Sequence, residues 1–319
     1  MSFDVSASVR CLIGGMEIEP FNRHIRERRA QRFADAFEPS QVEQLYNVAR
    51  LEDLLRPDTV PVSNVDIYRE GSLMRLADVQ KKSGKTHLAI VAENFRRGST
   101  IRVRDVDRFD GTLRRFQAEV QRYFTARSQI NLYLTPPGKS GFPPHFDITD
   151  VFVVQCRGAK DWSIFDSYTN QVELPLPETD WDPERFQPCG AVESLRLCAG
   201  DVLYLPRGAM HQAFCTNLES MHLTVSLTPL TVVDLLTQAF RTAAAKDPAL
   251  RQRVSWSLAA DLADTRALDA ELADHARRIA EQIDVEDLLQ SERLFLTGHT
   301  QDSGGKELQA VIDSLARQS

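Results

Sequence analysis

The sequence holds seven histidines, and one of them, His145, is followed two positions later by a carboxylate, Asp147. Residues i and i+2 of an extended strand point to the same face, and the preceding Pro143 and Pro144 favour an extended backbone. A third candidate ligand, His211, follows a turn signal and opens the next expected strand. Two imidazoles and one carboxylate form the facial triad of non-haem Fe(II) oxygenases, which leaves coordination positions open. The three residues therefore predict a metal site, although the same ligands also bind manganese, cobalt and nickel.

The His-x-Asp pair has little weight by itself. With 45 acidic residues among 319, about one such pair is expected by chance among seven histidines. A hydrogen-bonded pair at a strand turn is the default interpretation of His145 and Asp147, and a buried core histidine is the default for His211. The metal hypothesis depends on all three residues occurring together in a region of strands.

The middle of the chain has the pattern of an all-β core. Short runs rich in β-branched and aromatic residues alternate with glycine and proline, which is typical of a sandwich or barrel. The turn signals include Gly158, Gly200 and Gly208. The expected strands are Ile130–Thr135, Val151–Cys156, Trp162–Phe165, Glu193–Leu197, Val202–Leu205 and His222–Leu227.

Helical patterns flank this core. Ser40 and Glu43 have the spacing of a capping box, and a second helix is expected from Leu113 to Arg127. We expect a catalytic unit over residues 1–230 and a helical region over residues 231–319, whose apolar stripe either forms a dimer interface or packs against the outer surface of the barrel. Residues at helical spacing support these helices: Val42, Leu45, Val48 and Leu51 in the first, and Val233, Leu236, Phe240, Leu268, Leu272 and Ala276 after Thr231. A loop at Asp302–Gly305 is expected before a last short helix.

Composition limits the function classes. The 319 residues carry a net charge of −7 and a pI near 5.6, which makes nucleic-acid binding unlikely. The basic cluster Arg23–Arg32 is interleaved with Glu27 and is expected to be a solvated helix face, with binding of RNA or an acidic partner as the alternative. No apolar run is long enough for a membrane span, and no signal peptide is apparent. Five cysteines without a CxxC motif indicate reduced thiols and a cytoplasmic protein.

The order of motifs in the core resembles the cupin-type JmjC oxygenases, and within them it is most similar to the ribosomal oxygenase group. The resemblance covers roughly residues 125–230. It implies an α+β protein with a double-stranded β-helix, or jelly-roll, core between N-terminal helices and a C-terminal helical region. The segments that carry it are Asn131–Gly138, Pro144–Asp147, Val151–Gln155, Gly158–Trp162, Gly200–Gly208 and His211–Ala213.

The resemblance also implies roles for single residues. His145, Asp147 and His211 would bind Fe(II), and Lys160 would pair with the distal carboxylate of the co-substrate 2-oxoglutarate. The alternative for Lys160 is a surface residue in a hairpin turn after Gly158. Residues expected to hydrogen-bond the same carboxylate or to line the site are Tyr133, Thr224 and Asn131.

Other residues near these motifs have two readings each. His222 shares a strand face with Thr224, so it either lines the pocket or has a structural role. Arg207 either faces the substrate entrance or makes surface contacts at a turn. Trp162 and Phe152 are expected in the core.

The resemblance implies an Fe(II)- and 2-oxoglutarate-dependent hydroxylase that uses O₂ and acts on a protein or peptide side chain, with Arg or His of a ribosomal protein suggested. One alternative is a tailoring hydroxylase of a peptide natural product or free amino acid. Another is a non-catalytic metal-binding cupin, and a third is a cupin enzyme that uses a metal without 2-oxoglutarate. Lys160 speaks against the last, because such an enzyme has no need of a buried ammonium group.

Overall fold

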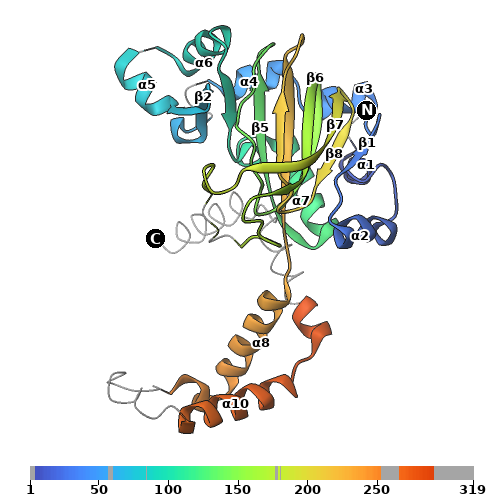
Figure 1. The fold of residues 1–319 in the computed structure, drawn as a ribbon, viewed down its shortest axis with the longest axis vertical. Helices are drawn as coiled ribbons and strands as arrows, with labels where there is room; N and C mark the ends of the chain where they lie inside the picture. Colours follow the sequence, from blue (N-terminus) through green and yellow to red (C-terminus); the bar gives the residue numbers. More distant parts are fainter. Residues whose placement is uncertain are drawn as a thin grey trace, which may run out of the picture. The chain divides into compact units, whose positions relative to one another are not determined.

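The computed structural model describes residues 4–56, 60–83, 85–176, 179, 181–252 and 266–290. The chain separates into two compact units, Met1–Pro229 and Leu230–Ser319 (Figure 1). All five cysteines are free, as the sequence predicted. None of the helices in these ranges has both the length and the apolar character needed to cross a membrane.

The first unit alternates helices with antiparallel strands. Its helices are α1 (Val5–Cys11), α2 (Ile18–Glu27), α3 (Pro39–Leu45), α4 (Val48–Leu54), α5 (Leu76–Ser83), α6 (His87–Arg96) and α7 (Gly111–Phe124). Its strands are β1 (Gln31–Phe33), β2 (Val65–Arg69), β3 (Ser72–Arg75), β4 (Thr100–Val103), β5 (Ala126–Thr135), β6 (Asp150–Tyr168), β7 (Pro188–Cys198), β8 (Val202–Leu205), β9 (His211–Phe214) and β10 (Ser220–Pro229).

Strand β6 joins the two layers of the β-core. Its first half lies in a sheet of order β1-β8-β6-β10-β5-β4-β2-β3, and its second half pairs with β7 and β9. Gly158 lies at this transition with φ +66, and a Cβ atom there would stand 1.7 Å from the carbonyl oxygen of Glu219. Only glycine combines that conformation with such a close approach. The arrangement agrees with the expected double-stranded β-helix.

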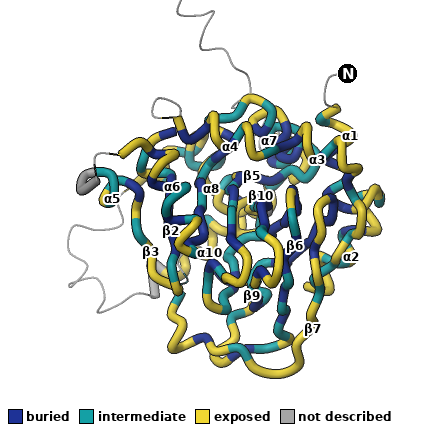
Figure 2. The backbone as a smooth tube through the Cα atoms, turned by 90° about the horizontal axis from the view of Figure 1, so that it is seen from above, coloured by how far each residue is buried: buried dark blue, intermediate teal, exposed yellow. Residues whose placement is uncertain are grey.

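Residue alternation gives the main sheet two different faces. In β5, Ile130 and Leu132 belong to a core cluster that also holds residues of α1 and α7, such as Val9 and Phe116. The residue between them, Asn131, lines a cavity on the other face. Figure 2 shows α1, α3, α4 and α7 on one side of β5, β6 and β10, and β7 and β9 on the other. The β-sheet therefore packs its apolar face on helices and turns its polar face inward.

The N-terminal helices differ from the sequence prediction. The helix expected through Val42 and Leu51 is two helices, α3 and α4, because the chain turns extended at Tyr46 and Asn47 caps the next helix through Arg50 N. The capping interaction of α3 is made by Gln41, whose side chain accepts from the backbone N–H of Glu38, rather than by Ser40 and Glu43.

The expected elements of the core also have different bounds. Helix α7 ends at Phe124, because Thr125 adopts a left-handed conformation with φ 49 and the chain enters β5 at once. Two expected strands, Val151–Cys156 and Trp162–Phe165, are parts of the single strand β6. The turn predicted at Gly158 is wrong, because this glycine lies within β6, where it pairs with Ser220.

The second unit is helical where it is described. Helix α8 (Val232–Lys246) begins with a capping box between Thr231 and Asp234, and is followed by the short η3 (Pro248–Arg251) and by α10 (Arg266–Ala280). The apolar stripe expected on α8 is exposed, with 59% of Val233, 42% of Leu236 and 43% of Phe240 accessible.

The stripe predicted on α10 is not its buried face. Leu272 and Ala276 are exposed, whereas Ile279 is buried. The side chain of Leu268 and the segment Asp302–Gly305 lie outside the described residues.

Candidate metal centre

The structure brings His145, Asp147 and His211 together. Each offers one ligand atom, and these atoms lie within 4.8 Å of one another. The backbones of His145 and His211 form two reciprocal hydrogen bonds of 2.9 and 2.7 Å. The carbonyl oxygen of Asp147 accepts from Gly208 N at 2.8 Å, so the turn before His211 also holds the acidic ligand. Residues separated by more than sixty positions are thus fixed by the backbone itself.

Both imidazoles are held in the tautomer that suits a metal ligand. The Nδ1 atom of His145 lies 2.9 Å from the carbonyl oxygen of Pro143, and that of His211 lies 2.9 Å from the carbonyl oxygen of Ala209. A carbonyl oxygen only accepts, so each Nδ1 carries the proton and donates. Each Nε2 then keeps its lone pair for a cation, which is the usual second hydrogen bond of a metal-binding histidine.

Electrostatics keep His211 neutral. Burial, with a smaller contribution from the neighbouring His145, lowers the pKa of His211 to about 4, and Asp147 only partly opposes this. Its Nε2 lies 3.7 Å from Oδ2 of Asp147. An uncharged imidazole beside a carboxylate at neutral pH is ready to bind a divalent cation without first losing a proton.

The local backbone of the triad differs in part from the prediction. His211 opens β9, as expected. His145 forms an isolated bridge to His211, and Asp147 lies in the irregular segment before β6 rather than on a regular strand. The two side chains still converge, because the extended backbone keeps the alternation that the argument required.

A cavity of about 270 Å³ adjoins the triad and ends at Lys160. This lysine lies on β6, where it is 4% exposed, so the alternative of a surface hairpin turn is wrong. Its Nζ donates to Oγ1 of Thr135 at 3.2 Å, and it forms no ion pair within the described part of the chain. Burial lowers the pKa of Lys160 to about 8. A buried ammonium group with one neutral partner lacks the anion that would stabilise it.

The other predicted residues line the same cavity. The ring of Tyr133 stacks on His222, with centroids 5.0 Å apart and planes at 6°. Burial raises the pKa of Tyr133 to about 12, so its hydroxyl is a proton donor. Thr224 lies two residue pairs further along the same two strands, opposite Asn131. The side-chain oxygen of Asn131 accepts from Asp105 N at 3.1 Å, which gives this residue a structural partner.

His222 faces the cavity, as one of its two readings expected. It is 3% exposed, and burial, helped by the charge of Lys160, lowers its pKa well below the ordinary value. The side chain is therefore a neutral wall of the site. The readings of Phe152 and Trp162 as core residues hold, although Trp162 also lines the cavity.

The sequence argument missed two residues of the site and the cavity role of a third. Thr135 is the partner of Lys160, and Arg102 lies on β4 opposite Tyr133 and lines the cavity. Trp162, expected only in the core, also lines the cavity, and its indole Nε1–H is buried with no hydrogen-bond partner in the described residues. Alternation along β5 places Thr135 on the same face as Tyr133, so that residue was accessible to the argument. Arg102 was not, because nothing local shows that β4 pairs with β5.

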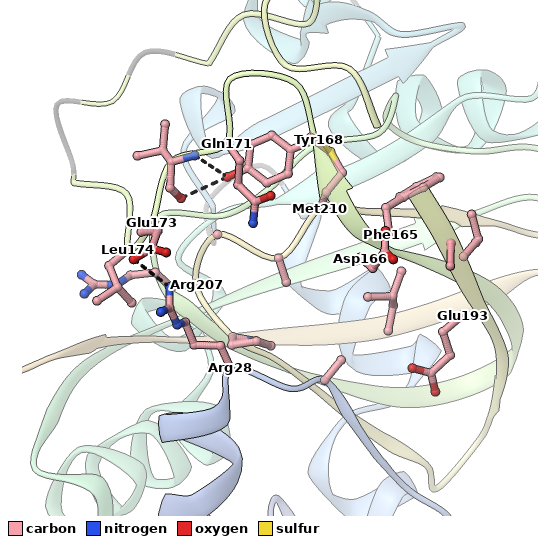
Figure 3. A pocket seen from close by; sticks show the side chains of 18 residues that line it. Arg28, Phe165, Asp166, Tyr168, Gln171, Glu173, Leu174, Glu193, Arg207 and Met210 are labelled. Carbon is pink, nitrogen blue, oxygen red and sulfur yellow. Dashed lines mark hydrogen bonds and ion pairs between the residues drawn. The ribbon is translucent and has the colours of Figure 1, made fainter. Parts of the chain in front are cut away.

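Arg207 lies outside the metal cavity. It lines a second cavity of about 400 Å³, shown in Figure 3, with Arg28, Tyr168, Glu193 and Met210 among its walls. Within the basic cluster, Arg28 lies 3.5 Å from Glu173 and Arg32 lies 2.8 Å from the buried Asp201. These ion pairs favour a structural role for part of Arg23–Arg32.

The geometry suits a small dianion that chelates a metal. Three protein ligands on one side leave the cavity side of a bound cation open. At the other end, Lys160 and the hydroxyl of Thr135 are placed to receive a carboxylate. The same molecule could therefore satisfy the metal and the buried ammonium group.

Comparison with known proteins gives one family match. Residues 104–235 match the model of the JmjC domain. Ribosomal oxygenase 1 of Gallus gallus is 31% identical over 223 residues, which are 68% of this chain and 36% of that protein. The bifunctional lysine-specific demethylase and histidyl-hydroxylase NO66 of Dictyostelium discoideum is 30% identical over 55% of this chain and 34% of that protein. The chain thus spans about a third of the length of these two relatives.

A solved structure has a similar fold. It is that of YcfD, a ribosomal oxygenase from Escherichia coli, in complex with cobalt and succinic acid. The match has a TM-score of 0.52 and 15% sequence identity, and it covers 87% of this chain and 69% of that one. At this identity, the likeness concerns the fold alone.

Proposed function

Because this chain carries a JmjC domain related to that of the ribosomal oxygenases, we propose that it is an Fe(II)- and 2-oxoglutarate-dependent oxygenase that hydroxylates a protein or peptide side chain. One observation carries the proposal. The His145–Asp147–His211 cluster and the buried Lys160 lie at the same cavity, and each lacks the partner that 2-oxoglutarate with iron would provide.

Iron with 2-oxoglutarate and O₂ supplies the oxidising power for hydroxylating a C–H bond, with succinate and CO₂ as products. The chain's own residues do the rest. The Nε2 atoms of His145 and His211 and the carboxylate of Asp147 would hold the metal, and the negative charge of Asp147 would offset part of the cation's charge. Hydrogen bonds from both Nδ1–H groups to backbone carbonyls keep the rings from turning.

The polar end of the cavity binds and orients the co-substrate. Lys160 donates to the distal carboxylate, and the hydroxyls of Tyr133 and Thr224 donate to the same group. Val153 and Trp162 are buried walls of the cavity and exclude water from their side of it. In this low-dielectric site the pairing of ammonium and carboxylate is stronger than in water.

We infer that the substrate is a histidine or arginine side chain of a ribosomal protein. The names of the relatives, a ribosomal oxygenase and a histidyl-hydroxylase that is also a lysine-specific demethylase, support this class. The same oxidative chemistry on an N-methyl group would give demethylation. Tailoring of a peptide natural product or a free amino acid is the alternative that the site also accommodates.

Mass spectrometry of the host proteome tests the substrate class. Cells that express the wild-type protein should contain a peptide heavier by one oxygen atom, and cells that express the Asp147→Ala variant should not. Modified ribosomal peptides would support our proposal, whereas a modified small molecule with an unchanged proteome would favour the tailoring alternative. A metal-bound protein that consumes no 2-oxoglutarate with any of these candidates would indicate a non-catalytic cupin.

Two further proposals concern the whole protein. We propose that it works in the cytoplasm, where ribosomal substrates and reduced cysteines are both expected. We also propose that it forms a homodimer through the second unit, since the stripe of Val233, Leu236 and Phe240 on α8 is exposed.

A further inference from the structure

A row of five polar side chains crosses the inner face of the main sheet. The strand registers pair Asp66 with Arg102, Arg102 with Tyr133, Tyr133 with His222 and His222 with Gln155. Directly opposed residues of antiparallel strands share one face and contact each other. We call this row the inner-face ladder. It runs from β2 at one side, through the cavity wall, to β6.

The contacts along the ladder are specific. Arg102 donates through Nε and Nη2 to Oδ2 of the buried Asp66, at 3.1 and 2.7 Å. Tyr133 lies directly opposite Arg102 across β4 and β5, and the two side chains interact electrostatically. The ring of Phe142 contacts both residues, 5.9 Å from the Arg102 guanidinium and 5.7 Å from the Tyr133 ring. Tyr68 lies 5.2 Å from the same guanidinium, and its ring centroid is 4.3 Å from that of Phe142, so the two rings lie on the same side of Arg102. Arg102 is thus held by a carboxylate and packed against two neighbouring rings.

We propose that Arg102 is a positioning residue for the co-substrate, and that it acts through Tyr133. A guanidinium only donates, so a hydrogen bond between these two facing side chains makes the phenolic oxygen of Tyr133 the acceptor. The single Tyr133 O–H proton is then free to point at an acceptor in the cavity. The parallel stacking on His222 fixes the ring plane. The inference rests on the proposed function, because the acceptor is the carboxylate of 2-oxoglutarate.

The need to balance the charge of Asp66 does not by itself explain why an arginine lies at position 102. Asp66 is 2% exposed and also pairs with Arg104, whose Nε lies 3.1 Å from Oδ2. One arginine already balances that charge, so Asp66, Arg102 and Arg104 together carry a net positive charge. Of the two arginines, it is Arg102 that lines the cavity. The surplus charge at this wall favours an anionic ligand.

A double-mutant cycle on 2-oxoglutarate binding tests this inference. The co-substrate is titrated into anaerobic Fe(II)-loaded protein, and the Kd is read from the visible charge-transfer band of the chelate. We expect Tyr133→Phe and Arg102→Met each to raise the Kd about tenfold, the loss of one hydrogen bond to a charged group. The Kd of the double variant should also be about tenfold higher than that of the wild type, because Arg102 has no effect without the Tyr133 hydroxyl.

The matched control is Arg104→Met, which removes the other partner of Asp66 and should leave the Kd within about twofold. A Kd that is raised about 100-fold in the double variant would overturn the inference, because Arg102 would then act independently of Tyr133. An unchanged Kd in Arg102→Met would also overturn it. If Arg102→Met fails to fold, Arg102→Lys replaces it in the cycle. Lysine keeps the charge but cannot reach Asp66 and Tyr133 together. Arg102→Lys should therefore raise the Kd for 2-oxoglutarate when Tyr133 is present, but not in the Tyr133→Phe variant. A wild-type protein without the band would instead contradict the proposed function.

Discussion

Replacing Lys160 with methionine should have opposite effects on stability and on co-substrate binding. Burial lowers the pKa of this lysine from 10.5 to about 8. At about 1.4 kcal/mol per pH unit, keeping it charged costs the folded protein about 3 kcal/mol at neutral pH. Methionine has a similar length and no charge. The ligand-free variant should therefore unfold with a free energy about 3 kcal/mol larger than that of the wild type.

The pH dependence follows from the same pKa. Between pH 8 and 10.5 the unfolded chain holds the Lys160 proton and the folded chain does not, so the wild type gains stability as the pH rises through this window. The destabilisation caused by the buried charge of Lys160 is fully present below about pH 8. The variant should lack this rise. For binding, only the charged amine pairs with the carboxylate, so the wild-type Kd for 2-oxoglutarate should increase up to about tenfold per pH unit above pH 8.

Binding should weaken strongly in the same variant, because the distal carboxylate would be buried without a counter-charge. Breaking a buried pair by removing one partner costs about 3 to 5 kcal/mol, which is at least about 100-fold in Kd. Urea denaturation gives the stability, and anaerobic titration of the Fe(II) protein gives the Kd. Lys139→Met, at an exposed lysine, is the control. A less stable Lys160→Met protein that binds 2-oxoglutarate within about threefold of the wild type would refute the reasoning.

Three other expectations concern the fold, the metal and assembly. Gly158→Ala should destabilise the protein by at least about 2 kcal/mol in urea denaturation. Gly71→Ala, at a position with a positive φ but open space around it, should cost only about 1 kcal/mol. Equal costs would contradict the close approach of Glu219 to Gly158. His145→Ala should weaken Co(II) binding at least about 100-fold in calorimetry, whereas His24→Ala should bind Co(II) as the wild type does. An unaltered affinity in His145→Ala would show that His145 is not a metal ligand. Leu236→Glu should shift the protein from dimer to monomer in light scattering, and an unchanged mass would exclude that face of α8.

The sequence predicted the site better than the elements that hold it. His145, Asp147 and His211 converge because two short extended segments lie side by side, and an i, i+2 spacing survives even where no regular strand forms. Alternation along β5 and β10 also predicted which residues face inward. These are local properties of an extended chain, and a sequence carries them directly.

Tertiary contacts determined what the sequence could not show. Glycine at position 158 suggests a turn, but the residue continues β6, because only glycine allows the close approach of the neighbouring strand at Glu219. Asn47 ends one expected helix by capping another. Arg102 reaches the cavity only because β4 pairs with β5, a pairing between segments with no shared signal. Propensity and spacing do not report such partners.

The central claim is that His145, Asp147 and His211 hold iron in a cavity that also binds 2-oxoglutarate through Lys160. The most direct measurement is the visible spectrum of anaerobic protein with Fe(II) and 2-oxoglutarate. Our account predicts a weak charge-transfer band that saturates at one equivalent of co-substrate and is lost in Asp147→Ala. A metal-loaded wild-type protein without the band, or a band of equal strength in Asp147→Ala, would contradict it.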